Sequence, residues 1–266
     1  MTINLSHINS QISCIKSKIS SAPPNRDALS LCFSLIDLTT LNSTDTIERI
    51  EELVNRVNGF PNRFPGIPNV AAICIYPSLI PTARGLLNAP DVLIASVAAG
   101  FPASQTFIEV KEAECRQCLS QGADELDIVI PLGAYLSGDQ QRVYDEVKRL
   151  KGVCGDAHLK VILETGALRT PADIYNVSKL AMEAGADFIK TSTGKLEPAS
   201  TPEAVYIMCQ AIAEYYKITG RRVGIKPAGG LSTPTDAVLY YLIVREVLGN
   251  EWLAPQLFRL GASRLA

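Results

Sequence analysis

Two lysines stand at the ends of short apolar segments. Lys190 ends ADFIK at residues 186–190, and Lys226 ends RVGIK at residues 222–226. Removing an ammonium group from water costs several kcal/mol unless the group is paired or deprotonated. A deprotonated lysine can attack a carbonyl carbon and form a Schiff base. Many lysines near strand ends only extend to solvent, but the recurrence of the pattern favours a chemical role.

A carboxylate in another apolar segment can pair with these lysines. Asp127 stands between Leu126 and Ile128 in an apolar segment. Desolvation and the like charge of a second lysine both disfavour an ammonium, so one amine can become the nucleophile while the other stays charged. Asp127 can pair with the charged lysine and move protons through a water. Supporting positions at or near other strand ends are Asp37, Thr39, Cys74 and Lys160. For Cys74 we expect packing, with a reactive thiol lining a pocket as the alternative.

Glycine-rich turns supply a second kind of signal. Gly229 and Gly230 follow the seventh expected strand, and residues 261–263 (GAS, ending in Ser263) follow the eighth. The loops after those two strands commonly bind phosphate in α/β barrels, through backbone N–H groups and a helix end. Taken alone, each glycine pair fits a tight turn equally well. Gly194 and Lys195 can extend the same phosphate site.

The elements that must position these residues alternate between strands and helices. Eight apolar segments read as strands, namely 31–38, 70–76, 92–97, 124–130, 159–163, 186–190, 222–226 and 258–261. Thr170, Thr201 and Thr233 each precede a proline and are placed to cap a helix, and Thr44 or Asp45 is placed to cap another helix that runs to about residue 57. Eight near-continuously apolar strands predict a closed parallel barrel. A count of seven or nine strands is possible, and a doubly wound open sheet is the alternative fold.

The two ends of the chain depart from the regular pattern. We treat residues 1–266 as one barrel domain in which residues 1–26 form an N-terminal extension with a helix near residues 8–19. The sequence stops soon after the eighth strand, so the last helix is expected to be missing or truncated. Apolar surface along the first and seventh helices should then be covered by the N-terminal segment or by a partner.

Composition narrows the classes of function. The 266 residues are 47% hydrophobic with a formal net charge of −2, which argues against general affinity for nucleic acid or anionic membranes. No apolar run spans a bilayer, and no signal peptide is recognisable. Seven cysteines, an odd number, fit a reduced cytoplasmic protein. Two histidines in unrelated elements give no basis for a metal site, and no nucleotide-binding motif is present, so no cofactor is expected.

Six motifs together resemble deoxyribose-phosphate aldolase, from about Leu35 to the end of the chain. They are LIDLTTLN (35–42), AAICIYP (71–77), GADELDIVIP (122–131), LKVILETG (159–166), GADFIKTSTGK (185–195) and GIKPAGG (224–230). The resemblance implies a TIM barrel and a lyase of deoxyribonucleotide and carbohydrate degradation. Its reaction is the reversible cleavage of 2-deoxy-D-ribose 5-phosphate to acetaldehyde and D-glyceraldehyde 3-phosphate, without metal.

The resemblance also implies roles for residues. Lys190 is the Schiff-base lysine, Lys226 the lysine that perturbs it, and Asp127 the proton-relay carboxylate. The substrate phosphate is held by Gly194, Lys195, Gly229, Gly230 and Ser263. The family is commonly dimeric and usually continues into a last helix and a tail, which this sequence does not show. Arg264 stands where a second serine is common, and it either adds charge to the phosphate site or faces solvent.

Two alternatives stay open. One is another Schiff-base aldolase or transaldolase that acts on a different phosphorylated sugar. The other is a catalytically impaired barrel that only binds sugar phosphates, although such a protein gains nothing from two lysines held together.

Overall fold

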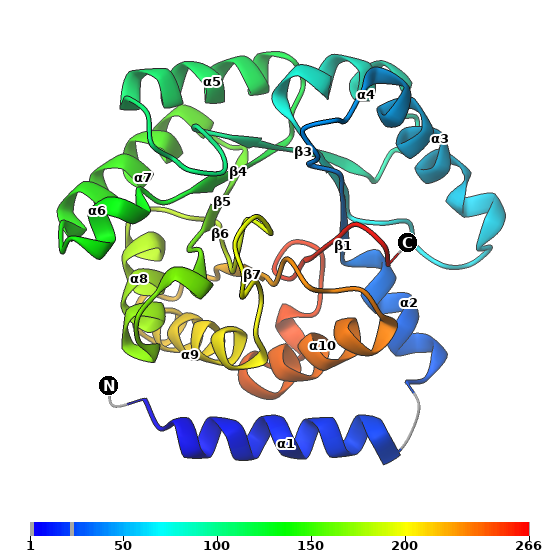
Figure 1. Cartoon of the computed structure of the whole chain (residues 1–266). Helices are drawn as coiled ribbons and strands as arrows, with labels where there is room; N and C mark the ends of the chain where they lie inside the picture. Colours follow the sequence, from blue (N-terminus) through cyan, green and yellow to red (C-terminus); the bar gives the residue numbers. More distant parts are fainter. Residues whose placement is uncertain (1–2, 22–23, 266) are drawn as a thin grey trace.

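The computed structural model describes residues 3–21 and 24–265. Eight parallel strands form one sheet in the order β7-β6-β5-β4-β3-β2-β1-β8. Their bounds are β1 Ile36–Thr39, β2 Ala72–Ile75, β3 Leu93–Ala98, β4 Glu125–Val129, β5 His158–Ile162, β6 Phe188–Lys190, β7 Gly224–Lys226 and β8 Leu260–Ala262. Isolated bridges from Ile225 to Phe258 and from Ala228 to Gly261 join the two end strands, so the sheet closes (Figure 1). The predicted barrel is confirmed, and the open sheet is excluded.

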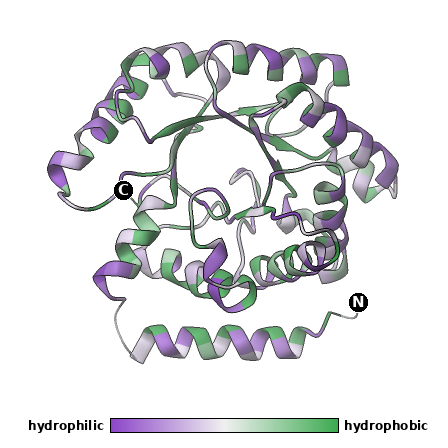
Figure 2. Cartoon of the chain, turned by 180° about the vertical axis from the view of Figure 1, so that it is seen from behind, coloured by the Kyte–Doolittle hydropathy of each residue, from purple (hydrophilic) through white to green (hydrophobic). Residues whose placement is uncertain are grey.

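Helices surround this barrel on its outer side (Figure 1). Those that connect successive strands are α3 Ile47–Arg63, α4 Ile80–Leu86, α5 Ile108–Ser120, α6 Leu132–Leu136, α7 Gln140–Cys154, α8 Pro171–Glu183, α9 Pro202–Thr219 and α10 Pro234–Leu248, with short 3-10 turns at Pro77–Leu79, Thr165–Ala167 and Asn250–Trp252. Hydrophobic residues dominate the strands, whereas the outer helices mix hydrophobic and hydrophilic residues (Figure 2). The pattern is that of a sheet buried on both faces and covered by helices.

The expected threonine caps are present. The side chains of Thr170, Thr201 and Thr233 accept the N–H groups of the third residue beyond each, and proline occupies the first helical position. The expected cap of α3 was wrong, because Thr46 is the N-cap and accepts from Arg49 N. Asp45 has a different role, since its carboxylate accepts the Thr40 hydroxyl at 2.8 and 2.9 Å.

The start of the barrel differs from the prediction. The segment 31–38 was predicted as one strand, but residues 31–34 belong to helix α2, Arg26–Ser34, and only β1 is extended. Asn25 caps α2 by accepting Ala28 N at 2.8 Å. The apolar run is therefore shared between a helix that packs outside the barrel and a strand within it, which hydrophobicity alone does not separate.

The N-terminal segment covers the outer face of the barrel. Helix α1, Leu5–Ser21, buries Ile8, Ile12 and Ile15 and contacts α9 and α10. Helix α2 contacts α10, and Phe33 of α2 packs edge-on against Phe60 of α3 and Phe64 just beyond it, at centroid distances of 5.3 and 5.7 Å. Helix α2 thus lies between the seventh and first barrel helices, where a helix after β8 would lie. Of the two covers expected, a partner or the N-terminal segment, the chain itself supplies one: α1 of the 1–26 extension packs on α10, the seventh barrel helix, whereas the first barrel helix is contacted by α2, which lies mostly beyond that extension.

Candidate active site

The charged side chains of the strands gather inside the barrel. Residues two apart on a strand point to the same side, so Glu125 and Asp127 of β4 both point inward. The strand register pairs Asp127 with Lys160 of β5, and Lys190 of β6 with Lys226 of β7. Side chains from neighbouring strands therefore meet inside the barrel near the carboxyl ends of β6 and β7.

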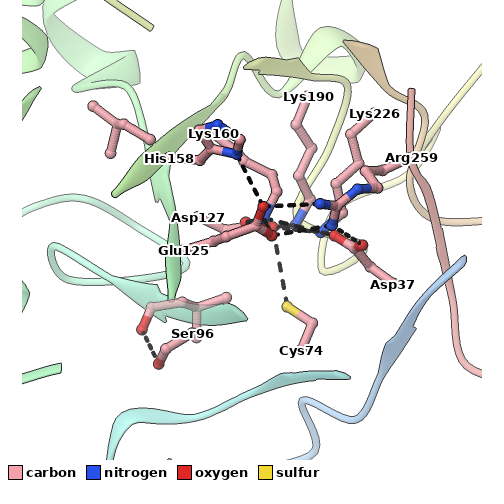
Figure 3. A network of polar contacts seen from close by, with 12 residues as sticks. Asp37, Cys74, Ser96, Glu125, Asp127, His158, Lys160, Lys190, Lys226 and Arg259 are labelled. Carbon is pink, nitrogen blue, oxygen red and sulfur yellow. Dashed lines mark hydrogen bonds and ion pairs between the residues drawn. The ribbon is translucent and has the colours of Figure 1, made fainter. Parts of the chain in front are cut away.

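Seven of these side chains form one connected set, which we call the charge network. None is more than 2% exposed to solvent, and Figure 3 shows the cationic groups converging on the carboxylates. Its members are Asp37, Glu125, Asp127, Lys160, Lys190, Lys226 and Arg259.

Asp127 is the centre of the charge network. Its Oδ2 accepts from Lys190 Nζ and from Lys226 Nζ, each at 2.7 Å, and its Oδ1 accepts from Lys160 Nζ at 3.0 Å. Lys226 Nζ also lies 2.5 Å from Asp37 Oδ2. One carboxylate thus holds three lysines, and two of their nitrogens share a single oxygen.

Arg259 and Glu125 form a second layer of the charge network. Arg259 donates to Asp37 Oδ1 at 2.7 Å and to the two oxygens of Glu125 at 3.0 and 2.9 Å. Glu125 also pairs with Lys160 Nζ at 2.6 Å and contacts the ring of His158 at 3.1 Å. The two layers are therefore joined through Asp37 and Lys160.

Mutual pairing keeps the three buried carboxylates and Lys226 ionised. Burial alone would raise the pKa of Asp127, but the charges of Lys160, Lys190 and Lys226 outweigh it and hold this pKa well below its usual range. The pKa values of Asp37 and Glu125 are lowered against burial in the same way by their cationic neighbours. Burial would lower the pKa of Lys226, yet Asp127 and Asp37 raise it. The raised pKa of Lys226 favours its ammonium form at neutral pH.

The charges of the network do not balance if every member is ionised. Four cationic side chains face three carboxylates, so one positive charge lacks a partner of opposite sign. Among the described residues, Lys190 is a cation of the network that lines the cavity beside the glycine-rich loops, and Lys160, Lys226 and Arg259 are not among the residues lining that cavity. Lys190 therefore differs from Lys226, which is fully buried and is not among the residues lining this cavity.

That cavity has a volume of about 420 Å³ and opens beside Lys190. All five residues expected to bind phosphate line it, namely Gly194, Lys195, Gly229, Gly230 and Ser263, together with Thr39. Asn42, Arg49 and Arg264 complete a polar wall. Sequence reasoning did not select Asn42 or Arg49, and it left the direction of Arg264 open. Arg264 lines the cavity and is exposed to solvent, so both alternatives left open for it remain compatible with the structure.

Backbone geometry keeps the cavity open at its glycine-rich side. Gly229 has φ of +84°, and a Cβ there would lie 2.6 Å from the Cβ of Ala199 and 3.3 Å from the Cα of Gly194. A side chain would both strain the backbone and push the two loops apart. Glycine is required at this position because the loops after β6 and β7 approach each other closely.

Glu164 fixes the loop that follows Lys190. This residue has φ of +53°, in the left-handed region that is costly for a non-glycine residue. Its carboxylate accepts Thr193 N at 3.1 Å and the Thr193 hydroxyl at 2.5 Å. A strained backbone held by two hydrogen bonds is typical of a functional site. It keeps the polar turn 191–194 in place directly after Lys190.

The remaining supporting residue is Cys74. Its side chain is fully buried, with Sγ 4.0 Å from Asp127 Oδ2, and burial raises the pKa of the thiol. This burial is consistent with the packing role expected for Cys74.

Sequence reasoning missed two members of the charge network. Glu125 lies two residues before Asp127, so the strand period already placed both carboxylates on one face. Arg259 stands inside the apolar segment FRLG before β8, the same signal that identified the two lysines. His158, one of the two histidines, is linked to the charge network by its contact with Glu125.

The model of one protein family matches residues 32–240, and it is described as the DeoC/LacD family aldolase. The chain belongs to this aldolase family. A deoxyribose-phosphate aldolase of Homo sapiens is 41% identical over 244 residues, which cover 87% of this chain and 76% of the human protein.

Solved structures of relatives agree with this assignment. A protein of Coccidioides immitis superposes with a TM-score of 0.76 at 26% identity, covering 98% of this chain and 95% of its own. The tetrameric deoxyribose phosphate aldolase of Aeropyrum pernix superposes with a TM-score of 0.68 at 28% identity, covering 91% of this chain and 95% of its own. Within residues 3–21 and 24–265 of the aldolase, no helix combines the length and apolarity needed to cross a membrane.

Proposed function

We propose that this aldolase cleaves 2-deoxy-D-ribose 5-phosphate to acetaldehyde and D-glyceraldehyde 3-phosphate through a Schiff base on Lys190. The observation that carries the proposal is the position of Lys190. Its Nζ lies 2.7 Å from Asp127, and the same side chain lines the cavity that holds every expected phosphate-binding residue.

The first step needs an uncharged amine. The charge network has one positive charge too many when all its members are ionised, and a neutral Lys190 removes that excess. The Nζ lone pair then attacks the aldehyde carbon C1 of the open-chain sugar, and loss of water gives an iminium ion. The positive charge of the iminium ion lies beside Asp127, where the ionised carboxylate stabilises it.

Cleavage breaks the bond between C2 and C3. The electron pair of that bond moves toward the iminium nitrogen and forms an enamine, while the C3 hydroxyl loses its proton and becomes the aldehyde of glyceraldehyde 3-phosphate. Asp127 is the proposed relay for this proton through a water, and the same relay returns a proton to C2. Hydrolysis of the resulting imine releases acetaldehyde and restores Lys190. Lys226 keeps its charge throughout and disfavours an ammonium on Lys190.

The phosphate group of the substrate is assigned to the part of the cavity lined by Gly194, Lys195, Gly229, Gly230 and Ser263, all of which line the same cavity as Lys190. Binding energy from the phosphate positions C1 near Lys190, since contacts remote from the reacting bond hold the substrate in place. The substrate identity is tested by comparing kcat/KM for deoxyribose 5-phosphate with kcat/KM for other phosphorylated sugars.

Assembly and compartment extend the proposal. A homodimer is the assembly that the family resemblance suggests, and sedimentation velocity at micromolar concentration distinguishes it from a monomer or a tetramer.

A cytoplasmic location is supported by the seven cysteines, all of them free and six of them buried. Fractionation of cells that express the tagged full chain tests this location.

A further inference from the structure

Glu125 and Arg259 are buried charges that the proposed reaction does not use. Neither belongs to the residues lining the cavity beside Lys190, so within the described chain neither reaches the substrate position. Both are nevertheless built into the barrel, since the Arg259 guanidinium also lies 5.7 Å from the ring centroid of Phe188. Phe188 in turn depends on Gly224, where a Cβ would lie 2.3 Å from its ring. Moving charged groups from water into a barrel core costs several kcal/mol of desolvation free energy, so we looked for a function of this buried pair.

Two short paths connect this pair with the reactive amine. Glu125 contacts Lys160 at 2.6 Å, and Lys160 contacts Asp127 at 3.0 Å. On the other side Arg259 contacts Asp37 at 2.7 Å, and Asp37 contacts Lys226. Both paths end at the carboxylate of Asp127: Lys160 contacts its Oδ1, and Lys226 contacts its Oδ2, the oxygen that also holds Lys190.

We propose that Glu125 and Arg259 are positioning residues that set, through Asp127, the fraction of Lys190 present as the uncharged amine. The proposal rests on the proposed Schiff-base function of Lys190. Because the two residues carry opposite charges in a water-poor interior, they act on a third charge with opposite signs. Glu125 favours the ammonium form of Lys190, and Arg259 favours the free amine.

Other charged and titratable residues face Lys190, Glu125 and Arg259, and all of them are unchanged in the variants compared below. They are Asp127 of β4, Lys160 of β5, Glu164 after β5, Lys226 of β7, Asp37 of β1 and Cys74 of β2, with Lys195, Arg49 and Arg264 on the cavity side and His158 facing Glu125.

The experiment is the pH profile of kcat/KM for cleavage, measured for the wild type and for Glu125→Gln, Arg259→Met and Arg259→Lys. Since the nucleophile must be uncharged, the acid limb reports its deprotonation. We expect Glu125→Gln to move the acid limb to lower pH and Arg259→Met to move it to higher pH, each by about one pH unit. Arg259→Lys keeps the charge, so it should return the limb toward the wild-type position.

A purely structural role predicts a different outcome. Variants that only loosen the barrel lower the melting temperature and kcat together and leave the acid limb in place. An unmoved limb, or a limb that moves in the same direction in both variants, overturns the proposal. If Arg259→Met does not fold at pH 7, Glu125→Gln alone decides. Its acid limb is expected to move to lower pH, which retains activity under more acidic conditions, and a variant that is merely damaged would not gain activity there. A wild type without cleavage or lysine trapping would instead refute the proposed function.

Discussion

Replacing Lys226 by methionine removes one positive charge beside the reactive amine while keeping an unbranched side chain of similar length. The Nζ atoms of Lys190 and Lys226 both lie 2.7 Å from Asp127 Oδ2, so they are separated by no more than twice that distance, roughly 5.4 Å. Two unit charges at about 5 Å in an effective dielectric constant of about 20 repel by about 3 kcal/mol. Without Lys226, Lys190 becomes the counter-ion of Asp127 and keeps its proton.

We therefore expect Lys226→Met to lower kcat/KM at pH 7 by about a hundredfold, since 1.36 kcal/mol corresponds to a factor of ten. The loss should shrink as pH rises, because deprotonation restores the nucleophile. The assay is steady-state cleavage from pH 6 to pH 10, with acetaldehyde measured by coupled reduction. Lys226→Arg is the matched control that keeps the charge. Activity of Lys226→Met within a few-fold of wild type at pH 7, or a loss that is independent of pH, would refute the reasoning.

Three further predictions concern stability and substrate binding. The pKa values of the three carboxylates in the charge network are lowered in the folded protein, so their contribution to the free energy of unfolding is complete above about pH 4 and is lost as pH falls further. The melting temperature, measured between pH 7 and pH 3, should fall steeply below about pH 4. Gly229→Ala should raise KM for the phosphorylated substrate several-fold more than Gly230→Ala, because a Cβ at position 229 collides whereas at position 230 nothing lies within 4 Å; equal KM values would contradict the assigned phosphate site. Phe33→Ala should lower the free energy of unfolding by about 3 kcal/mol, whereas Leu29→Ala, at a side chain 37% exposed, should cost much less in urea denaturation.

The sequence allowed most of the barrel to be predicted because its strands are near-continuously apolar and its later helices begin with threonine and proline. These are local signals, and local signals survive in a single sequence. Residues 31–34 were mistaken for strand because a helix and a buried strand look alike in a short apolar run. Only packing against Phe60 and α10 decides that segment, and such packing is not visible in one sequence.

The candidate site could be predicted in part for a similar reason. Lys190, Lys226 and Asp127 stand out because a charge in an apolar strand is expensive wherever the strand lies. Arg259 carries the same signal, but its contribution depends on where β8 meets β1, which spacing along the chain does not reveal. Asn42 lies in the loop after β1 and Arg49 lies in helix α3. Only the folded chain shows that both residues line the cavity.

Reductive trapping tests the central claim most directly. Wild-type protein is incubated with deoxyribose 5-phosphate and borohydride, and the modified peptide is identified by mass spectrometry, with Lys190→Ala as the matched control. Our account predicts a reduced adduct on Lys190 in the wild type and no adduct or cleavage in the control. An adduct on Lys226 or Lys160, or none although the substrate binds, would contradict it.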